Sequence, residues 1–195
     1  MFSNLFKGKF MSRFLFSLKY AQGLIIILML IPVLTFAQNQ DKVRISPKAM
    51  VKQTVGFTDV IIEYNRPGVK ERKIWGGLVP YHVVWRAGAN EATKITFNTD
   101  VEINGKKLKA GSYSFFAVPT KDNWTLIFNK VADQWGAFEY NEAEDALRIE
   151  VTPEEGYWQE WLAYTITKTS DNSAIIKLEW EKLKVPFIVI VDIEN

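Results

Sequence analysis

Cysteine is absent from this sequence of 195 residues, and histidine occurs once, at His82. Without cysteine the chain forms no disulfide, offers no thiolate nucleophile and accepts no lipid on a cysteine at a processed N-terminus. A single histidine leaves a zinc site short of its usual ligands, and a Ser-His-Asp arrangement could use only His82. We therefore expect no metal ion and no cofactor, and we interpret His82 as a residue at the start of a strand.

Acidic residues are missing from the first 37 positions, which hold four basic residues and then an apolar run from Gly23 to Ala37. This run is shorter than the roughly 20 apolar residues of a spanning helix, and Pro32 interrupts it. A basic region, a short apolar core and a small residue before a polar start are typical of an export signal, cleaved here between Ala37 and Gln38. We expect an exported protein, periplasmic or extracellular, with no membrane span after cleavage.

This signal also determines the expected domain organisation. We assign residues 1–37 to a cleavable signal peptide, 38–45 to a short linker and 46–195 to a single domain, with translation starting at Met1 or Met11. Removal of the signal leaves 20 of the 24 basic residues and all 22 acidic residues, so the net charge changes from +2 to −2. The basic character belongs to the signal, and we expect no nucleic-acid partner.

After the signal, apolar and polar residues alternate in short segments, which predicts strands. Asn104-Gly105 is typical of a type I′ hairpin that places Val101 opposite Leu108. The segment 111–118 is apolar on both faces, which predicts burial on both sides. The expected fold is all-β, an antiparallel β-sandwich of jelly-roll type with about ten short strands. We expect its one long loop to carry function. The predicted strands include 49–55, 58–64, 83–85, 94–97, 124–129, 147–151, 161–167, 174–181 and 187–191, the last inside a sheet.

The long loop connects Tyr64 to Thr93 and holds three of the five arginines that follow the signal. The planar fork of arginine suits carboxylate or phosphate, and long ordered loops on β scaffolds tend to carry function. We predict that the arginines meet in one solvent-reachable hollow. The alternative is structural, with Arg86 paired to Glu91 or Glu63 and fixing the loop to the sandwich. The candidate ligand-binding residues are Tyr64, Arg66, Arg72, Trp75, Tyr81, Arg86, Asn90 and Glu91.

Tryptophan occurs seven times, always after the signal. Trp124 and Trp180 alternate with polar residues in predicted strands, which favours core positions. Three others fall at loops, where a ring either anchors the loop or stacks on a sugar; they are Trp75, Trp135 and Trp158. The acidic segment 133–145 lacks the spacing of a calcium loop, so we interpret it as a solvated loop with one helical turn.

Several motifs, taken together, resemble one family. They are Gln53-Thr-Val-Gly56, Tyr64-x-Arg66-Pro67, Arg72-Lys-Ile-Trp75-Gly-Gly-Leu-Val-Pro80-Tyr81, Val84-Trp85-Arg86-x-Gly88-Ala-Asn90-Glu91-Ala-Thr93 and Asn129-Lys-x-x-x-x-Trp135-Gly136. From about Ser46 to the last predicted hairpin the sequence resembles the DUF2911 family of exported proteins, found chiefly in Bacteroidota. The resemblance implies an exported, mostly β domain, and it brings no activity, substrate or cofactor.

Three functional hypotheses remain open. The first is a binding module that takes a small anionic or carbohydrate ligand, or an envelope partner, through the region Tyr64–Thr93. The second is a hydrolase with Glu91 as general base and Arg86 or Arg66 stabilising negative charge. The third is a purely structural or assembly module, which an exposed apolar patch would favour. The scarcity of catalytic side chains favours a protein that is not an enzyme.

Overall fold

The computed structural model describes residues 43–193, which form ten strands and one short 3₁₀ helix. The expected signal peptide, 1–37, and positions 38–42 of the expected linker lie outside the described residues. The helix, η1 (Glu142–Glu144), confirms the expected single turn. The strands are β1 (Lys48–Val55), β2 (Thr58–Asn65), β3 (Thr93–Phe97), β4 (Val101–Ile103), β5 (Lys106–Leu108), β6 (Gly111–Pro119), β7 (Trp124–Asn129), β8 (Asp145–Val151), β9 (Glu154–Ser170) and β10 (Ser173–Val191).

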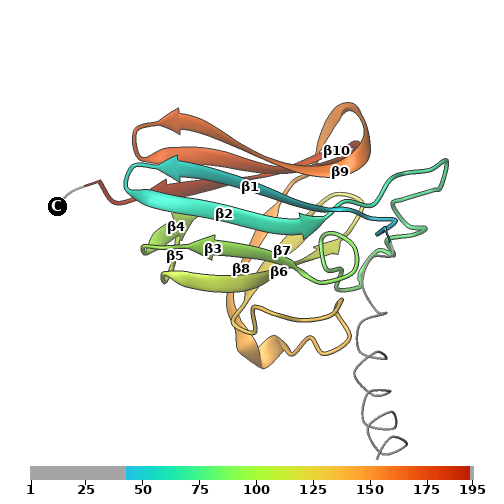
Figure 1. Cartoon of the computed structure of the whole chain (residues 1–195), viewed down its shortest axis with the longest axis horizontal. Coiled ribbons are helices and arrows are strands. Elements are labelled where there is room, and N and C mark those ends of the chain that lie inside the picture. Colours follow the sequence, from blue (N-terminus) through green and yellow to red (C-terminus); the bar gives the residue numbers. More distant parts are fainter. Residues whose placement is uncertain (1–42, 194–195) are drawn as a thin grey trace, which may run out of the picture. The chain divides into compact units, whose positions relative to one another are not determined.

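The strands make two antiparallel sheets (Figure 1). The first has the order β1-β2-β3-β6-β7-β8, and the second has the order β5-β4-β10-β9. The β4–β5 hairpin leaves the first sheet after β3 and pairs with β10, where Ile103 faces Val189. The long β9–β10 hairpin runs beside β1 at the top of Figure 1. The predicted all-β, sandwich-like architecture with about ten strands is confirmed.

Local sequence explains the tight turns. Gly56 joins β1 to β2 with a φ of +56°, a left-handed conformation that glycine adopts without a steric penalty. Asn104 and Gly105 have φ values of +46° and +82°, as a type I′ turn requires, and Val101 pairs with Leu108 as predicted.

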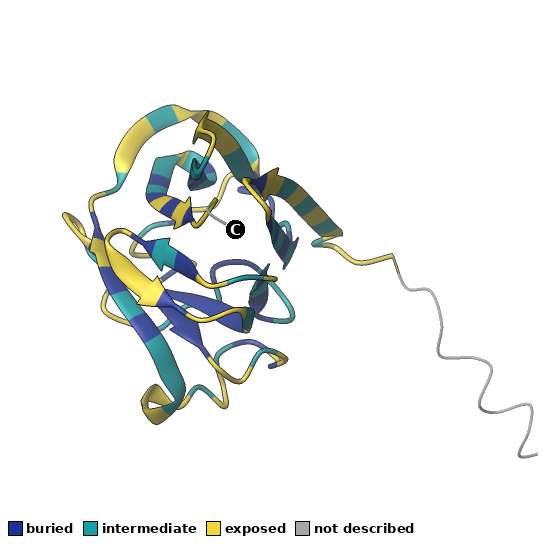
Figure 2. Ribbon diagram, turned by 90° about the vertical axis from the view of Figure 1, so that its left-hand side faces the viewer, coloured by how far each residue is buried: buried dark blue, intermediate teal, exposed yellow. Residues whose placement is uncertain are grey.

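The core lies between the two sheets. Ile62 and Phe115 of the first sheet belong to the same buried cluster as Phe187 of the second. Trp124 and Trp180 are each 1% exposed, which confirms their predicted core positions. In Figure 2 the buried residues follow the strands of the interior, and the exposed residues follow peripheral loops and edges. The alternation along each strand therefore separates a buried inner face from an outer face.

The outer face of the six-stranded sheet carries a second, smaller core. Phe116 and Ile127 are fully buried there beside Ala92, so β6 is buried on both faces as predicted. Ala137 and Tyr140, from the connection between β7 and β8, pack against this cluster. The connection thus covers the outer face over β6 and β7. The part of the outer face on β1, β2 and β3 lies beyond it and carries the candidate site.

Two predicted strands differ from the structure. Residues 83–85 form no strand, because only Trp85 pairs with a neighbouring strand. The Trp85 N–H donates to the Ala117 carbonyl at 2.8 Å, and the Ala117 N–H donates to the Trp85 carbonyl at 2.8 Å. His82 and Ala87, on either side, have φ values of +64° and +49°, which interrupt an extended chain. The apolar run 187–191 lies inside a sheet as predicted, but it is the end of β10 and not a separate strand.

Candidate functional site

A hollow of about 540 Å³ opens on the outer face, between β1–β3 and the segment 132–139. It is lined by charged, amide and apolar side chains: Lys48, Ala49, Met50, Glu63, Tyr64, Asn65, Glu91, Ala92, Lys94, Ala132, Asp133, Gln134, Trp135 and Glu139. Two lysines and four carboxylates belong to this lining, so its formal charge is −2. We call it the outer hollow.

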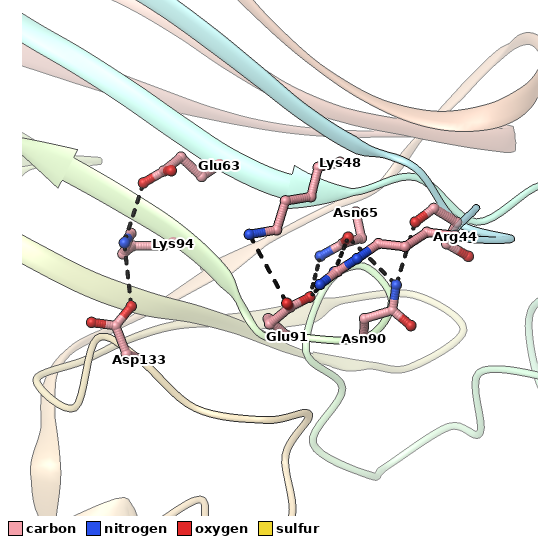
Figure 3. Close-up of polar contacts among 9 residues, drawn as sticks. Arg44, Lys48, Glu63, Asn65, Asn90, Glu91, Lys94 and Asp133 are labelled. Carbon is pink, nitrogen blue, oxygen red and sulfur yellow. Dashed lines mark hydrogen bonds and ion pairs between the residues drawn. The ribbon is translucent and has the colours of Figure 1, made fainter. Parts of the chain in front are cut away.

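Strand register brings the floor of the outer hollow together. Met50 of β1 faces Glu63 of β2, and Glu63 faces Lys94 of β3, so these side chains share one face of the sheet. The Lys94 ammonium lies 3.2 Å from Glu63 and 3.2 Å from Asp133 (Figure 3). Asp133, and then Glu63, raise the pKa of Lys94, while its partial burial opposes them. The lysine thus ties the sheet to the covering loop.

Glu91, which lines the hollow, accepts hydrogen bonds from two donors and lies within ion-pair distance of a lysine (Figure 3). Its carboxylate lies 2.7 Å from the Arg44 guanidinium, 2.9 Å from the Asn65 amide nitrogen and 4.0 Å from the Lys48 ammonium. The hydrogen bond from Arg44 is the largest cause that lowers the pKa of Glu91 to about 2, with a smaller effect from Lys48. A carboxylate stabilised so strongly in its charged form is a weak general base at neutral pH.

Gln134 presents an acceptor without a partner. The residue is 8% exposed, and its amide nitrogen donates to Ser114 Oγ at 3.0 Å, to Asn129 Oδ1 at 3.2 Å and to the Val131 carbonyl at 2.8 Å. The Asn129 amide nitrogen itself donates to Asp145 at 2.8 Å, which leaves Asn129 Oδ1 as an acceptor. These bonds determine the orientation of the Gln134 amide, and its oxygen is buried with no hydrogen bond.

Trp135 supplies an exposed aromatic ring at the same hollow. The residue is 59% exposed although its backbone is fixed by a bridge to Glu91. Met50, on β1, is 61% exposed and lines the hollow as well. An exposed indole beside amide and charged groups is a suitable surface for the apolar face of a sugar ring.

Three of the predicted site residues lie at or beside the outer hollow. Glu91 belongs to its lining, and Asn90 bonds nearby to the Ser46 carbonyl at 3.3 Å and to Asn65 at 3.4 Å. Tyr64 also borders the hollow, but its ring packs in the core with Tyr164 at a centroid distance of 4.8 Å. Tyr64 therefore supports the sheet, because its side chain lies on the inner face.

The arginines of the long loop do not meet in the outer hollow. Arg66 donates to the Leu162 carbonyl at 2.8 Å, and Arg72 donates to the Gly68 carbonyl at 2.5 Å, so both hold backbone segments. Neither they nor Arg86 belong to the lining. The outer hollow is therefore not the arginine-lined hollow that the sequence predicted, because sequence proximity does not determine which carbonyl each arginine reaches.

The structural alternative for Arg86 is also wrong in its proposed partners. Glu91 pairs with Arg44, and Glu63 pairs with Lys94. Within residues 43–193 the Arg86 side chain forms no ion pair, and its Nε is buried without a hydrogen bond. Among the three arginines of the loop, Arg86 is therefore the one whose side chain has no hydrogen bond or ion pair within residues 43–193.

The aromatic residues of the loop mainly stabilise it. Trp75 packs with Trp85, Trp124 and Trp180, at centroid distances of 4.8–5.9 Å. The Tyr81 ring lies against Gly76, where a Cβ would come within 2.7 Å of it. Trp75 and Tyr81 were predicted as ligand contacts, and the structure places them in loop packing outside the outer hollow.

Several lining residues were not among the predicted ones, namely Lys48, Met50, Lys94, Gln134 and Asp133. The alternation of β1, β2 and β3 places Met50, Glu63 and Lys94 on outward positions, which was a usable signal. The contribution of 132–139 had no such signal, because this segment is irregular.

The acidic segment 133–145 is partly neutralised by the protein itself. Arg148 lies 3.0 Å from Asp145 and 3.0 Å from Glu142. Burial, and then the hydrogen bond to Asp145, raise the pKa of Tyr140.

In the portion of the chain that the structure describes, no group of three or more acidic, histidine or cysteine side chains is suited to a metal ion. No helix between 43 and 193 is both long and apolar enough to span a membrane.

Comparison with known proteins adds one match. Residues 46–189 match a family model described as "Protein of unknown function (DUF2911)". No curated protein and no solved structure matches the chain.

Proposed function

This chain belongs to the DUF2911 family, whose description gives no function, and we propose that it is a binding module for a neutral carbohydrate that occupies the outer hollow. The observation that carries the proposal is an exposed aromatic ring beside polar side chains that line the same hollow. Trp135 is 59% exposed at the hollow, and Lys94 and Asp133 line the same hollow with a hydrogen-bond donor and an exposed acceptor.

The aromatic ring accounts for the apolar part of recognition. One face of a pyranose ring exposes C–H groups, and these groups pack well against a flat indole. Trp135 already exposes its ring, and the bridge to Glu91 fixes its backbone. A ligand therefore gains contact area without a large ordering penalty.

The polar side chains account for hydroxyl recognition. Gln134 lines the hollow, but its amide oxygen is itself buried, so the hydroxyl groups of a ligand would bond to the more exposed polar side chains of the lining. Asp133 and Lys94 add an acceptor and a donor on the same side of the hollow. Their mutual ion pair is largely exposed at Asp133, which leaves carboxylate lone pairs for hydrogen bonds.

The charge of the hollow favours a neutral ligand over an anionic one. Its lining has a formal charge of −2, which repels phosphate and carboxylate. The rival hydrolase hypothesis needs Glu91 to accept a proton, and the Arg44 bond opposes that step because it lowers the pKa of Glu91 to about 2. Binding without catalysis is therefore the better-supported function.

The test is a titration with neutral oligosaccharides of glucose, galactose, mannose and N-acetylglucosamine, followed by thermal unfolding and calorimetry. We expect at least one of them to raise the melting temperature. Trp135→Ala should weaken that binding by about tenfold, since an aromatic contact contributes about 1.5 kcal/mol. The free protein should keep its stability, because the ring is mostly exposed.

Trp158→Ala is the matched control. Trp158 is 53% exposed on β9, outside the lining of the outer hollow, so its removal should leave binding unchanged. Equal loss in both variants would indicate nonspecific contact with tryptophan. The proposal fails if no neutral oligosaccharide binds, or if Trp135→Ala binds as well as the unmodified protein.

We also propose that the protein acts outside the cytoplasm, in the periplasm or beyond it. The basic and apolar character of 1–37 supports export. A carbohydrate-binding role is consistent with that location, since the cell envelope and its surroundings present glycans.

A further inference from the structure

Arg86 differs from the other arginines of the described region. Arg44 pairs with Glu91, and Arg148 pairs with Asp145. Arg66 and Arg72 donate to backbone carbonyls. For Arg86, no side-chain hydrogen bond or ion pair exists within residues 43–193, and its Nε is buried. A guanidinium carries five donors, so this one has unused capacity.

The fold holds Arg86 on the outer face, under the segment that covers β6 and β7. The bridge between Trp85 and Ala117 places the Trp85 ring in the core cluster, and Arg86 follows it in the chain. A Cβ on Gly136 would come within 2.8 Å of the Arg86 terminal nitrogen, so the loop backbone lies directly against the guanidinium. The loop therefore packs against the guanidinium without offering it an acceptor.

An unpaired, partly buried cation is unfavourable for the folded protein. Burial lowers the pKa of Arg86, and no carboxylate opposes this effect. Glu91, which was the expected partner of Arg86, pairs with Arg44 instead. The cost of desolvating Arg86 is thus not offset by any described residue. Such a cost is offset when an external anion binds.

We propose that Arg86 is an anion-binding site, separate from the outer hollow, that takes a carboxylate group of a small ligand. Because Nε is buried, the two terminal nitrogens of Arg86 would hold a singly charged, planar carboxylate through two parallel hydrogen bonds. A doubly charged phosphate would need further cations, and Arg86 has none among its contacts in the residues described. The site is separate because Arg86 does not line the hollow that Trp135 borders.

The experiment observes the arginine Nε–Hε signals by NMR during titration with sodium acetate and with sodium glucuronate, at constant ionic strength. Acetate represents a free carboxylate, and glucuronate represents an acidic sugar. The Arg86 signal, identified by its loss in Arg86→Gln, should shift and saturate with one or both, while the Arg72 signal should not. Saturation only with glucuronate would assign the source to an acidic sugar.

Variants separate binding from folding. Arg86→Lys keeps the charge but loses the fork, so affinity should fall about tenfold. Binding should persist in Arg72→Gln, because Arg72 contacts its own loop. Trp135→Ala should not change it either, so this site and the carbohydrate site can fail independently. No saturable shift with either anion, or equal binding by Arg86→Gln as followed by calorimetry, would overturn the proposal.

A stability measurement tests whether the Arg86 guanidinium stabilises the folded protein. Arg86→Met keeps an unbranched apolar stem and removes the unpaired charge. We expect the ligand-free variant to melt at the same temperature as the unmodified protein or higher. A clear decrease would show that the guanidinium stabilises the fold, and the anion site would then be rejected.

Discussion

Glu91 links the segment before β1 to the end of the outer hollow. Its carboxylate accepts from Arg44 at 2.7 Å and from Asn65 at 2.9 Å, and 33% of the side chain is exposed. Arg44 is separated from Glu91 by 47 positions in the chain, so the bond joins distant segments. The same bond that suits Glu91 for this structural role makes it a poor base.

The pKa of Glu91 leads to a prediction about pH. Its value is about 2 in the folded protein against 4.5 ordinarily, so the charged form stabilises the fold. This contribution is complete above pH 4.5 and is lost as the pH falls toward 2. Glu91→Gln should therefore lower the free energy of unfolding by about 1–2 kcal/mol near neutral pH, allowing for solvent screening. Urea denaturation near neutral pH and at low pH measures the difference.

Glu139→Gln is the control for this measurement. Glu139 also lines the hollow, but it forms no ion pair with a residue of the described region. Its replacement should change stability little at either pH. If Glu91→Gln were as stable as the unmodified protein near neutral pH, the Arg44 contact would contribute nothing to the fold.

Among the strands, the β4–β5 hairpin connects the two layers. Its turn residue Asn104 accepts from the Ile188 N–H at 2.7 Å and donates its own N–H to the Ile188 carbonyl at 3.1 Å. The turn thus fixes the end of β10 as well as its own register. Gly105 has a φ of +82°, and a Cβ at this position would have no atom within 4 Å, so space is not its constraint.

Gly105→Val isolates the backbone requirement of this turn. Valine is unfavourable at positive φ, and we expect a loss of about 1–3 kcal/mol in the free energy of unfolding. Gly105→Asn should lose less, because asparagine tolerates the left-handed region. Chemical denaturation of both variants gives the comparison. Equal stability of the valine variant would mean that the turn changes its type without cost.

For the whole molecule, export is the remaining expectation. We predict that the protein recovered from outside the cytoplasm begins at Gln38, as intact mass or N-terminal sequencing would show. Ala37→Leu should accumulate as the uncleaved form, because signal cleavage needs a small residue at this position. A recovered protein that still carries 1–37 would contradict the prediction.

Part of the candidate site could be predicted from sequence and part could not. Glu91 and Asn90 were expected in a site, and they lie at or beside the outer hollow. Arg66 and Arg72 were expected with them, but their nearest acceptors are backbone carbonyls. Sequence shows which residues are arginines, and it does not show which acceptors the chain brings within about 3 Å of each.

The sequence by itself determined most of the strands, their faces and the tight turns. Those features depend on alternation and on residue types such as Asn104-Gly105, and both act between neighbours in the chain. Only the tertiary structure decided that Lys94 would lie between Glu63 and Asp133, and that Trp135 would border the same hollow. The physical reason is that these contacts depend on strand register and on the path of an irregular loop, which long-range packing determines.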